Sequence, residues 1–294
     1  EGFISNKGIR YDLVHSHYWM SGVAGLRLVQ KMQIPLVHMF HTLGIMKNRV
    51  AQTPEEVEGN YRIDGERRVL AGADHIIAST PAELAQLQFL YQADSRRISI
   101  IPPGVDTGRF YPIQMDEAKE YIGVPPCGRM LLFVGRIEPL KGLDVLLQAI
   151  ALMRESPEML DHSFCLSIIG GDPGTEDASQ EMQRIQALNR QYGLETLVTF
   201  LGKRSQDSLP YYYSAAEAVV VPSFYESFGM VALEAMACGT PVVASQVGGL
   251  AYLIKDGETG FTVPVDDPLA LADRLARLLR ENGLRAEMGQ RAVE

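Results

Sequence analysis

The stretch 218–245 constrains the fold of this chain most, because its residue pattern changes twice within 28 residues. Ala218–Val221 is a short β-branched run of the kind that is buried on both faces of a parallel sheet. Met230–Ala237 consists mostly of good helix formers. Gly239 and Pro241 end this helix before a second β-branched run begins. The stretch therefore predicts a strand, a loop, a helix and a further strand of an α/β fold.

The loop between this strand and this helix has the features of an anion-binding site. It lies at the carboxyl end of a predicted parallel strand, where ligands bind in open α/β sheets. It also leads into a helix whose first amides lack intrahelical partners and can bind a diphosphate. Glu226 lies in the loop and Glu234 in the helix, so two carboxylates flank the expected site. Without that context, two solvated helix charges would be the better interpretation of the pair.

The motif around these glutamates resembles the donor site of the family 4 retaining glycosyltransferases. It reads Glu226-x7-Glu234, with Ser-Phe-Gly between the two and Ala-Cys-Gly-Thr-Pro after them. The resemblance implies the GT-B fold, in which two Rossmann-like doubly wound domains face a cleft. In that family the first Glu contacts the donor sugar and the second binds the ribose hydroxyls. The amides that hold the donor sugar and its phosphate correspond here to Phe228, Gly229, Met230 and Val231.

A second loop with donor-site character, 135–142, follows the buried run 130–134. Arg136 offers a bidentate fork for a phosphate, and Lys141 offers a point charge. In the family, an Arg and a Lys at these positions hold the donor diphosphate. Gly170, which follows the next strand, could admit the ligand closely or could be a plain turn glycine.

The first part of the chain carries the residues expected to bind the acceptor. Segments 17–22 and 41–48 resemble those of sucrose-phosphate synthases and D-inositol-3-phosphate glycosyltransferases within the family. There, Tyr, Thr and Arg side chains bind the acceptor phosphate, and they correspond here to Tyr18, Thr42 and Arg62.

The resemblance also places His41 beside the donor sugar. The expected catalytic residues are therefore His41, Glu226, Arg136 and Lys141. The remaining strand histidines of this part, His15, His17 and His38, are expected to be buried residues without a role in the site.

The order of segments predicts alternating strands and helices in both halves of the chain. In the first half, strands are expected at 11–17, 35–40, 75–78 and 98–101, helices at 18–30, 61–71 and 81–91, and a mobile loop at 45–60. In the second half, strands are expected at 130–134, 164–169, 198–202, 218–221 and 241–245, with one helical pattern over 268–294.

The segment 102–112 is so rich in Pro and Gly that it predicts a connection between two domains. We therefore expect an acceptor-side domain at 1–111 and a donor-binding domain at 112–294. Family members begin with a further strand and a glycine-rich loop and close with a helix that returns to the first domain. The resemblance thus implies that both ends are truncated and that the N-terminal domain is incomplete.

Composition excludes several other classes of protein. The chain has 294 residues, 46% of them hydrophobic and 21% charged, which is typical of a globular protein of two domains. A net charge of −9 argues against a nucleic-acid partner. No apolar run is long enough to cross a membrane. Three scattered cysteines, read as small buried hydrophobes, fit neither a disulfide framework nor a zinc site and favour a cytoplasmic location.

The sequence also lacks the motifs of dinucleotide-binding and P-loop proteins, and no residue spacing suggests a metal site. We expect no cofactor, because cationic side chains and helix amides can stabilise a leaving diphosphate.

Together these features predict a retaining hexosyltransferase that uses a nucleotide diphosphate sugar, with a uridine-linked donor favoured. Its second substrate is a small acceptor, phosphorylated or neutral, and a homodimer is left open. The alternative is a sugar-nucleotide binding or scaffold protein without transfer activity.

Overall fold

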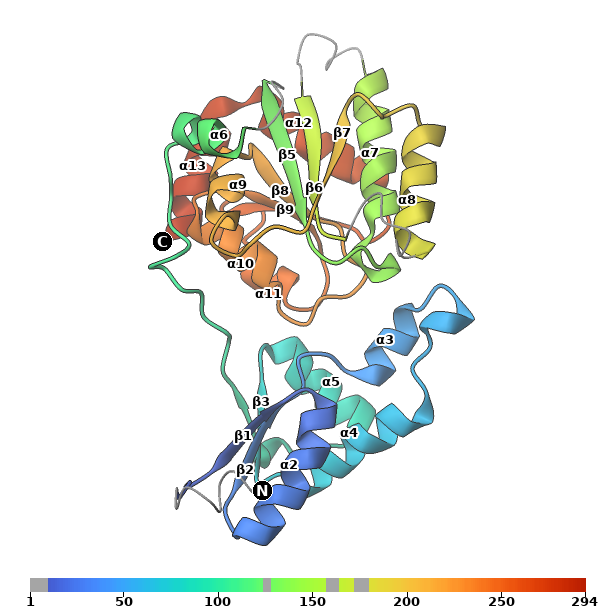
Figure 1. Ribbon diagram of the computed structural model, residues 1–294, viewed down its shortest axis with the longest axis vertical. Coiled ribbons are helices and arrows are strands. Elements are labelled where there is room, and N and C mark those ends of the chain that lie inside the picture. The colour runs from blue at the N-terminus through green and yellow to red at the C-terminus, as the bar shows by residue number, and fades with distance from the viewer. Residues whose placement is uncertain (1–9, 124–127, 157–163, 172–179) are drawn as a thin grey trace. The chain divides into compact units, whose positions relative to one another are not determined.

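The computed structural model describes residues 10–123, 128–156, 164–171 and 180–294, and each of its two compact units contains a parallel sheet (Figure 1). The first unit comprises the described residues up to Pro103 together with Tyr225–Phe228. The second unit comprises the described residues of Gly104–Phe224 and Gly229–Glu294. Both units have the α/β architecture predicted from the sequence.

The second unit is built on a sheet of six parallel strands in the order β10-β9-β8-β5-β6-β7. The strands are β5 (Arg129–Val134), β6 (Phe164–Ile169), β7 (Val198–Gly202), β8 (Ala218–Val221), β9 (Val242–Ser245) and β10 (Gly260–Val263). The chain passes from β5 outward to β7, then returns to place β8 on the other side of β5. The strand order therefore reverses between β5 and β8.

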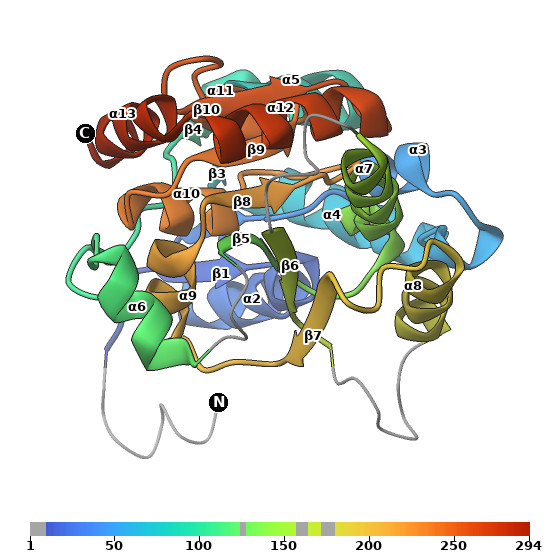
Figure 2. The ribbon, with the colours of Figure 1, turned by 90° about the horizontal axis from the view of Figure 1, so that it is seen from above.

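Helices cover both faces of this sheet, so its strands are buried on both sides. They are α6 (Met115–Ile122), α7 (Leu143–Glu155), α8 (Gln180–Gln191), α9 (Leu209–Ala215), α10 (Met230–Ala237), α11 (Leu250–Leu253), α12 (Pro268–Arg280) and α13 (Asn282–Val293). Figure 2 shows α7 and α8 on one side of the sheet and α9 and α10 on the other.

The two hydrophobic cores of this unit follow from the alternation of side chains along the strands. In β5, Leu131 and Phe133 pack in the core beneath α7 and α12. Met130 and Leu132 point the opposite way, into the core beneath α9 and α10. Burying a side chain of this size contributes about 2 kcal/mol. Because both faces of the sheet are buried, the strands are hydrophobic at every position instead of at every second one.

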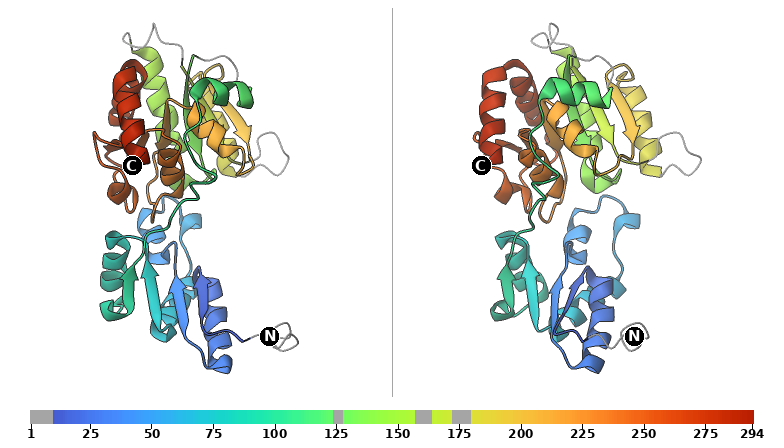
Figure 3. Two further views of the ribbon diagram at one scale, coloured as in Figure 1. Left: turned by 90° about the vertical axis from the view of Figure 1, so that its left-hand side faces the viewer. Right: turned by 60° about the vertical axis from the view of Figure 1, so that its left-hand side comes forward.

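The first unit contains four parallel strands in the order β1-β2-β3-β4, and Figure 3 shows them side by side. The strands are β1 (Val14–His17), β2 (Leu36–Met39), β3 (His75–Ala78) and β4 (Ile98–Ile100). Its helices are α2 (Trp19–Met32), α3 (Gly44–Val50), α4 (Asn60–Gly72) and α5 (Pro81–Tyr91). Short 3-10 turns lie at Pro54–Glu56 and Ser95–Arg97.

The prediction of a mobile loop at 45–60 is wrong for the first part of this segment, because α3 occupies Gly44–Val50. Ile45 and Met46 pack against the core of the first unit. The helix begins at Gly44, whose amide donates to both carboxylate oxygens of Glu66 at 2.9 and 3.1 Å. This cap comes from another helix, so the local composition could not reveal it.

The expectation for the strand histidines is confirmed for one of three. His38 is fully buried, with Nδ1 2.8 Å from the Ser16 hydroxyl oxygen. His15 and His17 are exposed, which contradicts the expectation. Side chains alternate along a strand, so His15 and His17 point to the opposite face of the sheet from Ser16, which is buried against Gly25 of α2.

The helical pattern over 268–294 is two helices rather than one. The chain leaves helical geometry at Glu281, where φ is −100° and ψ is 80°. Arg285 donates to the carbonyl oxygen of Leu278 at 3.3 Å and so satisfies an acceptor at the end of α12. The sequence analysis also missed the helices α6 and α11 and the short strand β10.

The cysteines differ from one another. Cys238 is a free, buried thiol, as expected. Cys165 is buried in the core, as expected, but it is disulfide-bonded, which the sequence analysis did not predict. Cys127 lies outside the described residues. Spacing along the chain does not reveal which thiols meet in three dimensions, and this explains the error at Cys165.

We predict that His38 makes the first unit sensitive to acid. Burial lowers the pKa of His38 to about 3, with further lowering by His17, His41 and His15. The unfolded chain therefore binds more protons than the folded one below pH ~6.5. Stability is retained above that pH and falls as the pH decreases, by up to ~1.4 kcal/mol per pH unit for one proton.

Thermal unfolding followed between pH 7 and pH 4 tests this prediction. His38→Gln should flatten the decrease in unfolding temperature, whereas the exposed His15→Gln should flatten it much less. An equally steep decrease in the His38 variant would show that other groups cause the acid sensitivity.

Candidate active site

The predicted donor residues of the second unit gather where its strand order reverses. β5 pairs with β6 on one side and with β8 on the other. The loops after β5 and β8 therefore leave the same sheet edge and diverge to opposite faces. This is the position at which doubly wound sheets bind nucleotides and other ligands.

The loop after β5 carries the two predicted phosphate-binding cations. The Arg136 side chain is 76% exposed, and its Nη1 forms an ion pair with Glu138 Oε1 at 2.7 Å. Lys141 ends the 3-10 turn Pro139–Lys141. An exposed ion pair contributes little to stability, typically below ~1 kcal/mol. Arg136 can therefore exchange Glu138 for an anionic ligand at small cost.

A close backbone contact joins this loop to the loop after β8. Gly142 has φ +65°, and a Cβ placed on it would lie 2.1 Å from the carbonyl oxygen of Pro222. The Phe224 amide also donates to the Leu140 carbonyl oxygen at 2.9 Å. Glycine is required at 142 because any side chain would force these two loops apart.

A close main-chain contact also explains why residue 170 is a glycine. Its φ is +140°, and a Cβ there would lie 1.8 Å from the carbonyl oxygen of Gly135. The Gly170 amide donates to the Gly202 carbonyl oxygen at 3.0 Å. The loops after β5, β6 and β7 thus meet through main-chain atoms, and this packing accounts for the glycine whether or not a ligand also approaches it.

The start of α10 presents main-chain donors as the sequence predicted. Gly229 precedes the helix with φ 105° and ψ 55°, and no side chain caps the helix. The amides of Met230 and Val231 belong to the first turn, where no intrahelical acceptor exists. Glu226 and Phe228 lie in the preceding segment, Tyr225–Phe228, which groups with the first compact unit.

Glu234 lies further along α10, and its carboxylate is oriented by a tyrosine. Tyr213 of α9 donates its hydroxyl to Glu234 Oε2 at 2.7 Å. Burial raises the pKa of Glu234, while the Tyr213 hydrogen bond lowers it. One carboxylate oxygen is thus fixed by the protein, and the second is suited to accept from a ligand hydroxyl.

Sequence analysis missed Tyr213 because it is 21 positions from Glu234 and on another helix. Tyr213 is fully buried, and burial raises its pKa well above the ordinary value. It therefore remains a hydrogen-bond donor. The run Tyr211-Tyr-Tyr213 is the one sequence signal that could have drawn attention to it.

Of the three predicted acceptor residues of the first unit, Arg62 is hydrogen-bonded to each of the other two. Arg62 of α4 donates from Nη1 to the Tyr18 hydroxyl at 3.3 Å and from Nη2 to Thr42 Oγ1 at 2.9 Å. The Arg62 guanidinium carbon also lies 5.3 Å from the centre of the Tyr18 ring. The three residues that the sequence grouped therefore form one contiguous cluster. We call Tyr18, Thr42 and Arg62 the acceptor clamp.

Arg62 is almost fully buried, with 1% of its side chain exposed. Its charge is compensated by Glu58 and Glu66, which accept from Nη1 at 2.6 Å and from Nε at 3.0 Å. Tyr91 also donates its hydroxyl to Glu66. The sequence analysis did not identify Glu58, Glu66 or Tyr91, because only the fold brings them to the guanidinium.

His41 lies beside this cluster with an unusual backbone. Its φ is +64°, and Tyr18 has φ +70°. His41 Nε2 is 2.8 Å from His17 Nδ1. Burial lowers the pKa of His41, and His17 and His15 lower it further. His41 is therefore neutral at neutral pH and can either donate or accept a hydrogen bond, according to its tautomer.

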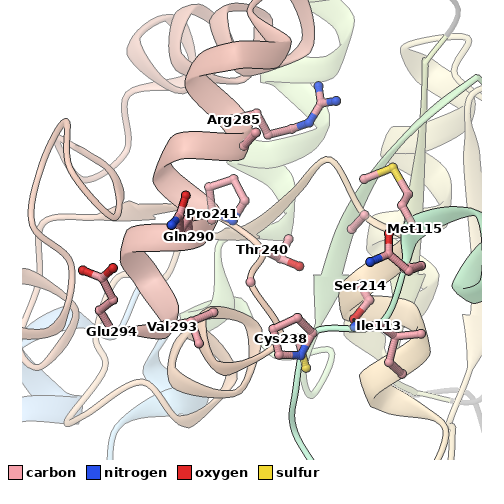
Figure 4. Close-up of a pocket in the computed structure, with 16 residues that line it drawn as sticks. Ile113, Met115, Ser214, Cys238, Thr240, Pro241, Arg285, Gln290, Val293 and Glu294 are labelled. Carbon is pink, nitrogen blue, oxygen red and sulfur yellow. Dashed lines mark hydrogen bonds between the residues drawn. The ribbon is translucent and has the colours of Figure 1, made fainter.

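A pocket of about 720 Å³ lies elsewhere in the second unit, at the amino end of β9 (Figure 4). Its lining includes Thr240, Ser214 and Arg285, whose polar atoms bond to other protein groups. The Arg285 Nε, for example, is 2.8 Å from Glu217 Oε2. None of the predicted donor residues lines this pocket, so it is distinct from the candidate donor site.

Among the described residues, no group of three or more His, Cys, Asp or Glu side chains could hold a metal ion. The same part of the chain contains no helix that is long and apolar enough to cross a membrane.

Comparison with solved structures agrees with this architecture. Sucrose-phosphate synthase from Thermosynechococcus elongatus is 35% identical, with a TM-score of 0.87 over 99% of this chain and 70% of that one. The Anabaena protein Alr3699/HepE, crystallised with UDP and glucose, has a TM-score of 0.81 over 99% of this chain and 74% of its own. At 22% identity, this second likeness concerns the fold alone. The fold is GT-B, as predicted.

Residues 114–294 match the family model described as glycosyl transferases group 1, and residues 4–109 match glycosyltransferase family 4. The chain belongs to the group 1 glycosyl transferases. It is 44% identical over 285 residues to D-inositol 3-phosphate glycosyltransferase 2 of Catenulispora acidiphila, covering 97% of this chain and 66% of that protein. The corresponding values for the Actinosynnema mirum D-inositol 3-phosphate glycosyltransferase are 43% over 283 residues, 96% and 67%. This chain spans about two thirds of the length of these relatives.

We predict that Gly142→Ala destabilises the second unit far more than Gly257→Ala. Both glycines have positive φ, +65° and +77°, so both substitutions incur the left-handed backbone penalty of ~1–2 kcal/mol. Only at Gly142 would the new Cβ meet a backbone atom, whereas nothing lies within 4 Å at Gly257. The Gly142 variant should lose roughly 3 kcal/mol or more of unfolding free energy.

Chemical denaturation of the two variants measures this difference. Similar losses in both would mean that the contact between the two loops is not the constraint that fixes glycine at 142.

Proposed function

We propose that the protein is a retaining hexosyltransferase that moves a hexose from a nucleotide diphosphate sugar to a hydroxyl of a small phosphorylated acceptor. The observation that carries the proposal is the position of Arg136, Lys141 and the α10 amides at the strand-order reversal of the second unit. Cations and uncapped amides at that edge suit a diphosphate. The donor we infer is uridine-linked.

The names of two kinds of relative support a phosphate on the acceptor side or in the product. The curated relatives carry the name D-inositol 3-phosphate glycosyltransferase, and the solved structure at 35% identity is a sucrose-phosphate synthase. The acceptor clamp of this chain, a guanidinium with two hydroxyls, has the chemistry that recognises a phosphate. We therefore infer a polyol phosphate or a sugar phosphate as the acceptor.

In the reaction we propose, the bond between the anomeric carbon and the donor diphosphate breaks as the acceptor oxygen attacks from the same face. The departing diphosphate gains charge, which Arg136, Lys141 and the amides of Gly229, Met230 and Val231 would stabilise. The proton of the acceptor hydroxyl passes to the leaving phosphate oxygen. No side chain acts as a covalent nucleophile in this scheme.

The remaining predicted residues would bind and orient the donor. Glu226 and His41 would contact the sugar, with Gly170 and Phe228 beside the donor. Glu234 would accept from the ribose hydroxyls. The alternative, a sugar-nucleotide binding or scaffold protein, shares this donor site but lacks turnover. A panel of nucleotide sugars and acceptors assayed with the full chain separates the two, because only the transferase releases nucleoside diphosphate upon acceptor addition.

We predict that Glu234→Ala weakens donor binding by ~1.5–3 kcal/mol, the scale of a lost charged hydrogen bond. Tyr213→Phe keeps the carboxylate and removes only the hydroxyl that orients it, so its effect should be smaller, ~0.5–1.5 kcal/mol. Calorimetric titration with a uridine diphosphate sugar measures both values. An unchanged donor affinity in Glu234→Ala would remove this residue from the ribose-binding role.

We predict that Arg62→Ala raises the acceptor KM roughly 10-fold or more, the effect of losing ~1.5–3 kcal/mol. Slow hydrolysis of the donor should remain unchanged, because the acceptor clamp does not bind the donor in this scheme. Arg67→Ala is the matched control, since Arg67 is a solvent-exposed arginine of the same helix.

Arg62 compensates two carboxylates, so its loss can also destabilise the first unit. Arg62→Lys retains the charge without the bidentate fork and should raise the acceptor KM in a folded protein. A preference of the wild-type enzyme for neutral acceptors, or equal damage to donor hydrolysis in a folded Arg62 variant, would contradict the role of the clamp.

A further inference from the structure

The five N–H groups of Arg62 all have acceptors in this structure. Nε donates to Glu66 Oε1 at 3.0 Å, and Nη2 donates to the Thr42 carbonyl oxygen at 3.3 Å and to Thr42 Oγ1 at 2.9 Å. Nη1 donates to the Tyr18 hydroxyl at 3.3 Å and to Glu58 Oε1 at 2.6 Å. An anion can bind to this guanidinium only by displacing one of these partners.

Glu58 is the partner that can leave most readily. Glu66 is fully buried and also accepts from the Gly44 amide and the Tyr91 hydroxyl. The Thr42 carbonyl belongs to the main chain. The Tyr18 and Thr42 hydroxyls can turn toward a phosphate while remaining beside it. Glu58, in contrast, has 17% of its side chain exposed, whereas that of Arg62 is 1% exposed.

Glu58 also binds a second cation in the manner of a phosphate. The same oxygen, Oε1, forms an ion pair with Lys47 Nζ. Lys47 lies on α3, and 27% of its side chain is exposed. One carboxylate oxygen therefore bridges a guanidinium and an ammonium group. Burial raises the pKa of Glu58, but hydrogen bonds and charges from Lys47 and Arg62 lower it more, so the carboxylate stays ionised.

The backbone at Glu58 is anchored independently of its side chain. Asn48 donates from Nδ2 to the Glu58 carbonyl oxygen at 3.0 Å, and the Glu58 amide donates to Asn48 Oδ1 at 2.6 Å. The carboxylate can therefore leave Arg62 by rotation of its own side chain while the main chain remains in place. Such rotations are fast compared with loop rearrangements.

Charge balance makes the exchange necessary. The buried cluster contains two cations, Arg62 and Lys47, and two carboxylates, Glu58 and Glu66. A phosphate added beside an unmoved Glu58 would place like charges in contact, which is unfavourable at low local dielectric. When Glu58 turns away, both cations it held become available to the phosphate.

We propose that Glu58 occupies the phosphate position of the acceptor clamp and is displaced by the acceptor, and that Lys47 then becomes a further ligand of that phosphate. This inference rests on the proposed function, in which Arg62 binds a phosphorylated acceptor. It assigns Glu58 a competitive role, so removing its charge should strengthen acceptor binding.

The test is equilibrium binding of inositol phosphate and inorganic phosphate to the full chain, with neutral inositol as the uncharged reference. Glu58→Gln removes the negative charge that pairs with Arg62 and Lys47, and should lower the Kd for phosphate ligands about 5-fold. Glu55→Gln, an exposed charge removal in the same segment, is the matched control and should change the Kd much less. Lys47→Met should raise the Kd, and more strongly in the Glu58→Gln background, where the wild-type lysine no longer has its carboxylate.

The outcomes distinguish failure of the proposed roles of Glu58 and Lys47 from failure of the proposed function, a phosphorylated acceptor. Phosphate binding that depends on Arg62 but is unchanged or weakened in Glu58→Gln, with normal thermal unfolding, would overturn the role of Glu58 and leave the clamp intact. An unaltered Kd in Lys47→Met in both backgrounds would overturn the role of Lys47. If neither the wild type nor Glu58→Gln binds phosphate ligands, the phosphorylated acceptor itself is wrong.

Discussion

The close approach of main-chain atoms at one edge of the six-stranded sheet is the constraint on which the second unit depends. Gly142 lies so close to the Pro222 main chain, and Gly170 so close to the Gly135 main chain, that neither Gly142 nor Gly170 can carry a side chain. These contacts fix the loops after β5, β6 and β8 relative to one another. Arg136 and Lys141 lie on these loops and so start from a rigid support, which in the proposed function reduces the entropy lost on donor binding.

The acceptor clamp is stabilised by ion pairs and side-chain hydrogen bonds instead of main-chain contacts. A buried guanidinium is costly unless it is paired, and Arg62 has two carboxylates and two hydroxyls around it. Glu66 is shared with the start of α3 and with Tyr91, so it links the charge of Arg62 to the packing of the first unit. The donor loops are thus held by backbone contacts, whereas the clamp is held by exchangeable ionic partners.

The sequence predicted the parallel α/β architecture and most strand positions because buried parallel strands leave a local signal. β3, β6, β7 and β8 agree with their predicted ranges. Local patterns were equally sufficient for α5 and α10, each bounded by residues that begin or end helices. They failed at α3 and at Glu281, where a side chain from elsewhere, Glu66 or Arg285, satisfies the end of a helix.

The candidate site shows the same division. Tyr18, Thr42 and Arg62 could be grouped because a motif resemblance identified each of them, and the fold brings their polar atoms together. The residues that orient them or compete with them could not be predicted in this way. Tyr213 reaches Glu234 from another helix. Glu58 precedes α4 and lies four positions before Arg62, but its sharing between Arg62 and Lys47 depends on where α3 is placed.

Backbone strain is concentrated at two neighbouring strand ends of the first unit. Tyr18 follows β1 and His41 lies just beyond β2, and both adopt positive φ although neither is glycine. Such conformations cost on the order of 1–3 kcal/mol and persist only where surrounding contacts compensate for them. The Tyr18 amide donates to the Met39 carbonyl oxygen at 2.9 Å, which ties the two strand ends together. The strained backbone interrupts the alternation of the strands and lets Tyr18 face Arg62 while His41 faces His17. Gln33, Gln92 and Asp266 also have positive φ, but Tyr18 and His41 differ from them in lying at neighbouring strand ends, beside the residues predicted to bind the acceptor.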